Sequence, residues 1–106
     1  MIRRIWRGWT TAENGDAYER LLKEQVFPDI AAMKVTGYAG IQLLRRSLPS
    51  GEQEFMTVMT FRSIEDVRGF TGEDYERAHV PEAARRLLAR FDATSAHYEV
   101  RAEQRY

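Results

Sequence analysis

The stretch from Glu54 to Arg62, EFMTVMTFR, constrains the fold more than any other part of the sequence. Its alternation predicts a strand with large apolar side chains on both sides, Phe55, Met59 and Phe61 on one and Met56 and Val58 on the other. An antiparallel strand with one solvated face would carry polar residues on that face. We therefore expect both faces of the sheet to be covered.

The surrounding patterns predict the order strand, helix, strand, strand, helical region, strand. The four expected strands are Ile2–Thr11, Tyr38–Leu48, Glu54–Arg62 and Ala96–Arg101. This order is typical of an α+β fold of the ferredoxin-like, split βαβ type, with helices on one face of an antiparallel sheet. We predict a single domain, residues 1–106, and a homodimer that packs two sheets face to face, since the helices of one copy cover one face.

The first helix is expected from Asn14 or Asp16, both good N-cap residues, through an apolar pattern that reaches Met33, with Gly37 as its stop and a kink at Pro28. Ser63, followed three residues later by Asp66, matches a loose capping box that opens a short helix. Glu73 to His79 is compatible with one or two helical turns. Pro81 then suits the first position of a further helix.

The composition excludes several classes of function. Sixteen basic and 16 acidic residues give a net charge of zero, so the chain has no electrostatic footprint for nucleic acid. It has no cysteine, which removes disulfides and thiolate metal ligands. Nowhere do 18 uninterrupted apolar residues occur, so we predict no membrane partner and a cytoplasmic location.

The strand RIWRGWT, the segment VTGYAGIQLLRR, the stretch EFMTVMTFRSIEDVRGFTGEDYERAHVP and the closing HYEV resemble small proteins of the antibiotic biosynthesis monooxygenase superfamily. This resemblance covers nearly the whole chain. It implies a dimeric α/β barrel with a pocket inside each monomer, between the sheet and its helices. The superfamily includes cofactor-independent oxygenases of aromatic polyketides and haem-degrading enzymes.

The haem-degrading branch uses an Asn on the first strand, a Trp in the second helical region and a His ligand about ten residues later. The corresponding positions here hold Gly8, Phe70 and His79, so only the histidine is kept. These two departures weaken a haem interpretation, and we predict no cofactor, although a neutral imidazole in an apolar pocket can still bind haem iron.

His79 has two interpretations from the sequence. It is either an axial ligand or general base, because imidazole exchanges a proton near neutral pH, or a partly exposed residue that packs before a helix. The residues alone favour the second, since His79 has no partner at metal-binding or triad spacing; the resemblance makes the two equal. For His97, in the closing strand, we favour a place on the dimer or solvent face. No metal site is predicted.

Several aromatic and apolar residues are candidates for the lining of a pocket for an aromatic ligand, and the alternative is that they form the core: Trp6, Met59, Phe61, Phe70, Tyr75 and Phe91. The core is favoured for Phe61 and Phe91. The polar tips of Trp6 and Tyr75 favour places nearer a cavity. Arg4, on the same strand face as Trp6, either meets an acidic ligand or pairs at the surface, and we favour surface pairing.

Together these features favour a cofactor-independent monooxygenase-like protein acting on a small aromatic or polyphenolic substrate. His79 would accept a proton, Tyr75 would hydrogen-bond a substrate oxygen, and Trp6, Phe70, Met59 and Arg4 would bind the substrate. The alternatives are a non-catalytic dimeric protein that binds a small molecule or haem, and a structural relative whose pocket is filled.

Overall fold

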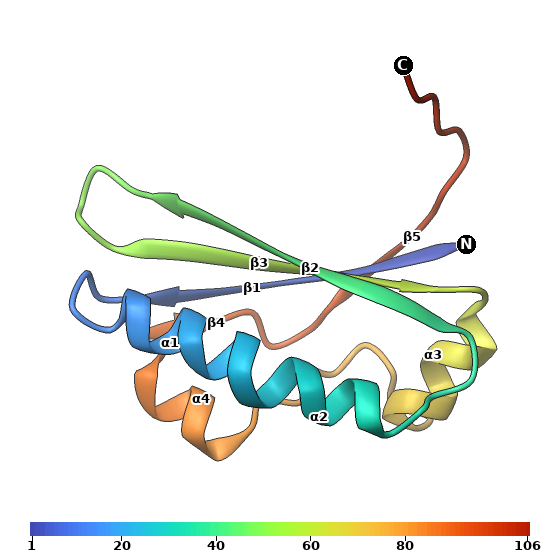
Figure 1. Cartoon of the computed structure of the whole chain (residues 1–106), viewed down its shortest axis with the longest axis horizontal. Coiled ribbons are helices and arrows are strands. Elements are labelled where there is room, and N and C mark those ends of the chain that lie inside the picture. The colour runs from blue at the N-terminus through green and yellow to red at the C-terminus, as the bar shows by residue number, and fades with distance from the viewer.

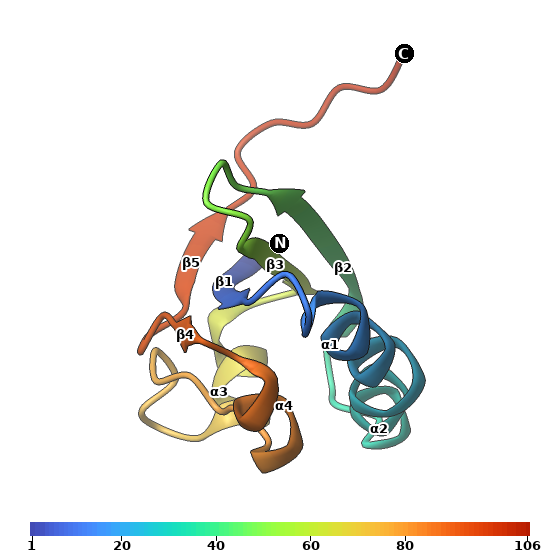
Figure 2. The same ribbon diagram turned by 90° about the vertical axis from the view of Figure 1, so that its left-hand side faces the viewer.

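The computed structural model describes residues 1–106. Its elements are β1 (Ile2–Thr10), α1 (Gly15–Leu21), a π-helical turn η1 (Leu22–Val26), α2 (Phe27–Ala32), β2 (Tyr38–Ser47), β3 (Gln53–Phe61), α3 (Ile64–Thr71), α4 (Glu82–Leu87), β4 (Arg90–Phe91) and β5 (Ala96–Glu99). All helices lie on one side of the sheet (Figures 1 and 2). The predicted α+β, ferredoxin-like architecture is confirmed.

The sheet has the order β2-β3-β1, and the short strands β4 and β5 both pair with β1 on its other side. Every pairing is antiparallel. Arg4 lies opposite Met59, and Trp6 lies opposite Thr57. Because directly opposed residues of an antiparallel pair share a face, these four side chains lie together on the helix side of the sheet.

Pro28 affects the first helical segment through one widened turn. The backbone N–H of Phe27 donates to the carbonyl of Leu22, five residues back, and α2 begins with Pro28 in its first turn. Proline has no N–H and its ring crowds the carbonyl four residues earlier, so a π-helical turn before it accommodates both effects. The disruption predicted at Pro28 therefore takes the form of η1.

Helix α3 begins as the sequence predicts. The Ser63 hydroxyl accepts a hydrogen bond from the backbone N–H of Asp66, at 3.2 Å. Gly37, with φ of 78°, lies against the same turn, and a Cβ at Gly37 would overlap the Asp66 carboxylate. The close approach and the positive φ together require glycine at this position.

Two expectations for the segment before α4 are wrong. Residues 73–79 form no helix; Arg77 instead bridges to Thr94, and the N–H of Ala78 donates to the carbonyl of Ala93. Pro81 is the N-cap of α4 rather than its first residue, with ψ of 146°. Proline disfavours helical geometry in the residue before it, and pairing with residues 93–95 satisfies this segment's backbone in another way.

The core consists of two buried clusters on the helix side of the sheet. One contains Tyr18, Leu22, Phe55 and Ala84, and the other contains Met59, Phe61 and Val67. Phe61 is fully buried, as predicted, whereas Phe91 is only partly buried. Since the clusters are separate, the space between them is where a cavity can form.

The opposite face of the sheet has no covering layer (Figure 2). It carries Ile5, Leu44, Met56, Val58 and Tyr98, with Leu44 47% and Tyr98 59% exposed. The C-terminal segment 100–106 leaves β5 on this side, away from the helices (Figure 1). We call this surface the open face. None of the helices has the length and apolar character needed to span a bilayer.

Candidate functional site

A cavity of about 110 Å³ lies between the sheet and the helices. The sheet contributes Arg4, Trp6, Ile41, Thr57 and Met59; the helical side contributes Tyr18, Leu22, Val26, Phe27, Ile30, Phe70 and Ala84; the connections contribute Ala78, His79, Val80, Pro81 and Ser95. Five of the six predicted site residues are among them: Arg4, Trp6, Met59, Phe70 and His79. A mostly apolar wall with a few polar groups is typical of a small-molecule site.

Arg4 is buried, so the surface pairing that we favoured from the sequence is wrong. Its side chain is 5% exposed, and Nη1 donates to the Tyr75 carbonyl at 2.5 Å while Nη2 donates to the Arg77 carbonyl at 3.3 Å. Nη1 also contacts Nε2 of His97 at 2.9 Å. Burial with no compensating carboxylate lowers the pKa of Arg4.

The contact with Arg4 determines the protonation state and the tautomer of the His97 ring. A guanidinium can only donate, so Nε2 of His97 accepts and the neutral ring carries its proton on Nδ1. Burial, and then the positive charge of Arg4, lower the pKa of His97, against a smaller opposing effect of Glu76. His97 thus acts as a neutral acceptor that helps to hold Arg4 in place.

Tyr75 lies behind Arg4 and is not among the residues that line the cavity. Its ring packs edge-on against His97, with centroids 5.1 Å apart, and the Arg68 guanidinium lies over it at 5.2 Å. Only its backbone carbonyl contacts Arg4. The structure therefore does not bring the Tyr75 ring together with the other predicted site residues.

His79 lies at the mouth of the cavity. It is exposed, and together with Val26, Ile30, Phe70 and Pro81 it also lines a neighbouring surface pocket of about 250 Å³. These five shared residues form the rim through which the cavity and the outer pocket adjoin. His79 can therefore contact a molecule that enters from the side of α2.

The ring of Trp6 lines the cavity, but its indole N–H is already bonded within the protein. Its indole Nε1 donates to the carbonyl of Asp92 at 2.7 Å, and its ring lies against Phe91 with centroids 6.0 Å apart. Gly8 makes room for it, because a Cβ there would come within 2.9 Å of both the Trp6 ring and Leu88. Trp6 is thus suited to stacking on a ligand.

Two buried polar residues of the cavity are not predicted from the sequence. Tyr18 is 1% exposed and Ser95 is 5% exposed, and both line the cavity. Burial raises the pKa of Tyr18, so its hydroxyl stays protonated. A tyrosine within the apolar stripe of the first helix was the available signal, since its hydroxyl needs a partner when buried. Ser95 had no such signal, because its burial depends on its contact with residue 76.

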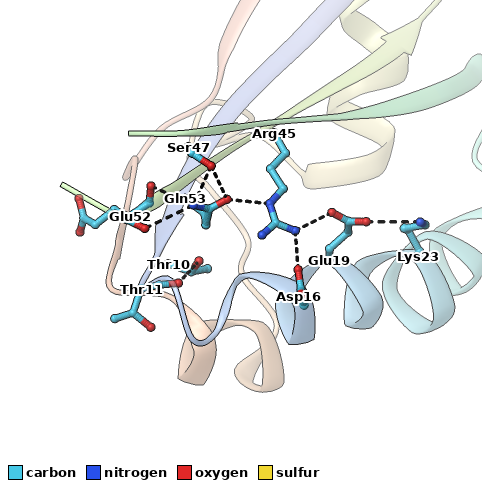
Figure 3. Close-up of polar contacts among 10 residues, drawn as sticks. Thr10, Thr11, Asp16, Glu19, Lys23, Arg45, Ser47, Glu52 and Gln53 are labelled. Carbon is cyan, nitrogen blue, oxygen red and sulfur yellow. Dashed lines mark hydrogen bonds and ion pairs between the residues drawn. The ribbon is translucent and has the colours of Figure 1, made fainter. Parts of the chain in front are cut away.

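A second arginine on the helix side of the sheet, Arg45, has partners of opposite charge. Its Nη1 donates to Asp16 at 2.9 Å and to Glu19 at 3.0 Å, linking β2 to α1 (Figure 3). These hydrogen bonds, that to Glu19 foremost, raise the pKa of Arg45. Its guanidinium also lies 5.1 Å from the centre of the Phe55 ring. We call Arg45, Asp16, Glu19 and Phe55 the Arg45 cluster.

Haem, which the resemblance left open, is not accommodated by the cavity in this form. Pockets for drug-sized ligands span roughly 300–1,000 Å³, and this cavity measures about 110 Å³. His79 lies at its rim, and the partner that would orient an axial imidazole is not found: no hydrogen bond of its ring is present.

Comparisons with known proteins give the fold. No family model matches the chain, and no curated protein does. Among solved structures, the chain is similar to a Bacillus cereus protein described as a putative antibiotic biosynthesis monooxygenase. The superposition has a TM-score of 0.63 and 15% sequence identity, and it covers 99% of this chain and 94% of the other. At that identity the likeness establishes the fold, which is the one that the sequence resemblance implies.

Proposed function

We propose that this chain is a cofactor-independent monooxygenase-like enzyme that acts on a small aromatic or polyphenolic substrate in the cavity between sheet and helices. The observation that carries the proposal is the cavity itself, which places an aromatic wall, buried polar groups and a histidine at its mouth around one space. The fold likeness to a protein named as a monooxygenase supports it.

The proposed chemistry needs little from the protein. His79 takes the proton of a phenol or enol at the rim, and the resulting anion reduces molecular oxygen. A carbon–oxygen bond forms, the O–O bond breaks, and for a simple phenol the sum is phenol plus O₂ giving quinone plus water. The substrate supplies all the electrons, so the protein has to bind, orient and exclude water.

The side chains divide these tasks. Trp6, Phe70 and Met59 form the walls against which a planar ring stacks, and Arg4 provides the positive charge that stabilises an anionic oxygen. We predicted that Tyr75 would hydrogen-bond the substrate oxygen. Because its ring lies outside the cavity, the proposal gives that role to Tyr18.

Oxygen uptake tests this function. The purified protein is mixed with electron-rich monophenols, such as 1-naphthol, in the presence of a metal chelator, and oxygen consumption and quinone absorbance are followed. His79→Ala is expected to lower the rate at least about a hundredfold, the usual contribution of a general base. Glu73→Ala, an exposed change in the same connection, is the control and should leave it unchanged. Binding without any oxygen uptake would favour the alternative, a non-catalytic binding protein.

The proposal includes a homodimer formed through the open face. Exposed Leu44 and Tyr98 surround Ile5, Met56 and Val58, which one chain leaves uncovered. Sedimentation at protein concentrations from micromolar upward should give the mass of two chains. Met56→Glu should shift the protein to one chain, whereas Ala89→Glu, on the surface outside the sheet, should not. A wild-type monomer throughout would contradict the dimer.

A further inference from the structure

Two buried hydroxyls of the cavity have no partner in the protein. No hydrogen bond of the Tyr18 or the Ser95 hydroxyl is present, although the two residues are 1% and 5% exposed. Yet no fully enclosed side-chain nitrogen or oxygen in the molecule lacks a partner. Both hydroxyls must therefore keep contact with open space, and the space that both residues line is the cavity. Hydroxyls with unused capacity at a cavity wall are ready to bind a polar group of a ligand.

Arg4 adds a charge that the protein does not neutralise. Its three contacts are two backbone carbonyls and a neutral imidazole, and its Nε–H donates to no group of the chain. A desolvated cation without an anion is costly, and the cost is recovered when an anion is bound beside it.

The Arg45 cluster shows that an arginine on the helix side of the sheet can have acidic partners in this fold. Arg45 also extends from the sheet toward the helices, and there Asp16 and Glu19 supply the negative charge (Figure 3). Of these two arginines, Arg4 makes no ion pair with a carboxylate, and it is the one that lines the cavity. The absence of an acidic partner thus coincides with the presence of a cavity.

We propose that the cavity binds a hydroxylated aromatic carboxylic acid, whose carboxylate pairs with Arg4 and whose hydroxyl meets Tyr18 or Ser95. This inference rests on the proposed function and narrows its substrate class. The volume of about 110 Å³ limits the enclosed part of the ligand to one ring, since it is below the roughly 150 Å³ of an apolar cavity that is known to bind benzene. Larger substituents extend past Phe70 and His79 into the outer pocket of about 250 Å³.

The test compares ligands that differ only in charge. Benzoate and benzamide have nearly the same shape, and their binding to the full chain is measured by calorimetry and by the fluorescence of its two tryptophans, of which Trp6 lines the cavity. Benzoate is expected to bind at least about tenfold more tightly, the usual gain for a hydrogen bond to a charged group. Equal affinities would overturn the proposal. Acetate should bind more weakly than benzoate, and equal binding of acetate would overturn the aromatic part.

Variants assign the charge to Arg4. Arg4→Gln, which removes the positive charge, should reduce the benzoate preference about tenfold or more, whereas Arg20→Gln on the surface of α1 should not. Tyr18→Phe should weaken binding of 3-hydroxybenzoate but not of benzoate. A benzoate preference that persists unchanged in Arg4→Gln would overturn the site. If Arg4→Gln fails to fold, the wild-type comparison of benzoate with benzamide still decides.

The same samples separate this inference from the proposed function. If benzoate binds through Arg4 but no phenol drives oxygen uptake, the anion site stands and the oxygenation is wrong. If neutral phenols are oxidised while benzoate has no advantage over benzamide, the oxygenation stands and the anion site is wrong.

Discussion

The Arg45 cluster and the cavity at Arg4 are two solutions to one problem, a cation on the covered face of the sheet. At the cluster the charge meets two carboxylates and packs over Phe55, which is fully buried. At the cavity the charge meets only neutral acceptors, and open space lies beside it. The Arg45 cluster stabilises the fold. The cavity leaves unfilled space and an unpaired charge, and a bound ligand can fill the space and neutralise the charge.

The largest expected difference between the two regions is in packing. Phe55→Ala should destabilise the fold by about 3–5 kcal/mol, because it removes the ring against which Tyr18 and Arg45 pack and leaves a cavity. Met59→Ala should cost less, about 2 kcal/mol, since Met59 borders a cavity and already lacks contacts on one side. Denaturant unfolding measures both, and equal losses would indicate that the cavity is filled in solution.

A conservative exchange separates the two arginines. Arg4→Lys should destabilise by about 1–3 kcal/mol, because one ammonium cannot reach both carbonyls and His97, and buried acceptors lose their donor. Arg45→Lys should stay within about 0.5 kcal/mol, since a lysine can still pair with a surface carboxylate. Thermal unfolding of the two variants gives the comparison. A larger loss for Arg45→Lys would reverse the assignment of roles.

The sequence predicted the fold well because its local signals agree with the tertiary structure. The alternation in residues 54–62 gave the strand and its two faces, and Ser63 gave the start of α3. The prediction was wrong where contacts between residues far apart in the sequence determine the backbone conformation. Residues 73–79 pair with residues 93–95 instead of forming helical turns, and no local pattern carries that information.

The site was predicted in part for a similar reason. The strand alternation placed Arg4 and Trp6 on one face of the sheet. It did not determine whether Arg4 is buried or exposed to solvent on that face. The acceptors of Arg4 lie more than 70 residues away along the chain, so its burial was invisible. Tyr18 was assigned to the apolar stripe of a helix, and its free hydroxyl is a property of the cavity alone.

The acid response should come from the cavity side. Burial and the charge of Arg4 lower the pKa of His97 in the fold, so at pH values between its folded and unfolded values the unfolded chain binds more protons. Stability contributed by neutral His97 is complete above about pH 6.5 and is lost as the pH falls below that value. Glu76 opposes the effect, and the ring is partly exposed, so the loss should be less than about 1 kcal/mol.

Unfolding curves from pH 8 to pH 5 measure this loss. The decline should be shallower in His97→Gln than in the wild type. His79→Gln, which removes the other histidine, serves as the control and should follow the wild type. A decline that persists in His97→Gln would place the acid response elsewhere.

The smallest expected change in stability tests one atom of the cavity, the Tyr18 hydroxyl. Tyr18→Phe should change the free energy of unfolding by no more than about 0.5 kcal/mol, because the hydroxyl that it removes has no partner in the protein. Thr10→Val is the matched control, since the Thr10 hydroxyl is fully buried and donates to the Thr11 carbonyl at 2.8 Å, and its loss should cost about 1 kcal/mol. A cost for Tyr18→Phe as large as that for Thr10→Val would mean that the hydroxyl has a structural partner. The cavity would then lose one of the two free hydroxyls on which the binding of a hydroxylated acid depends.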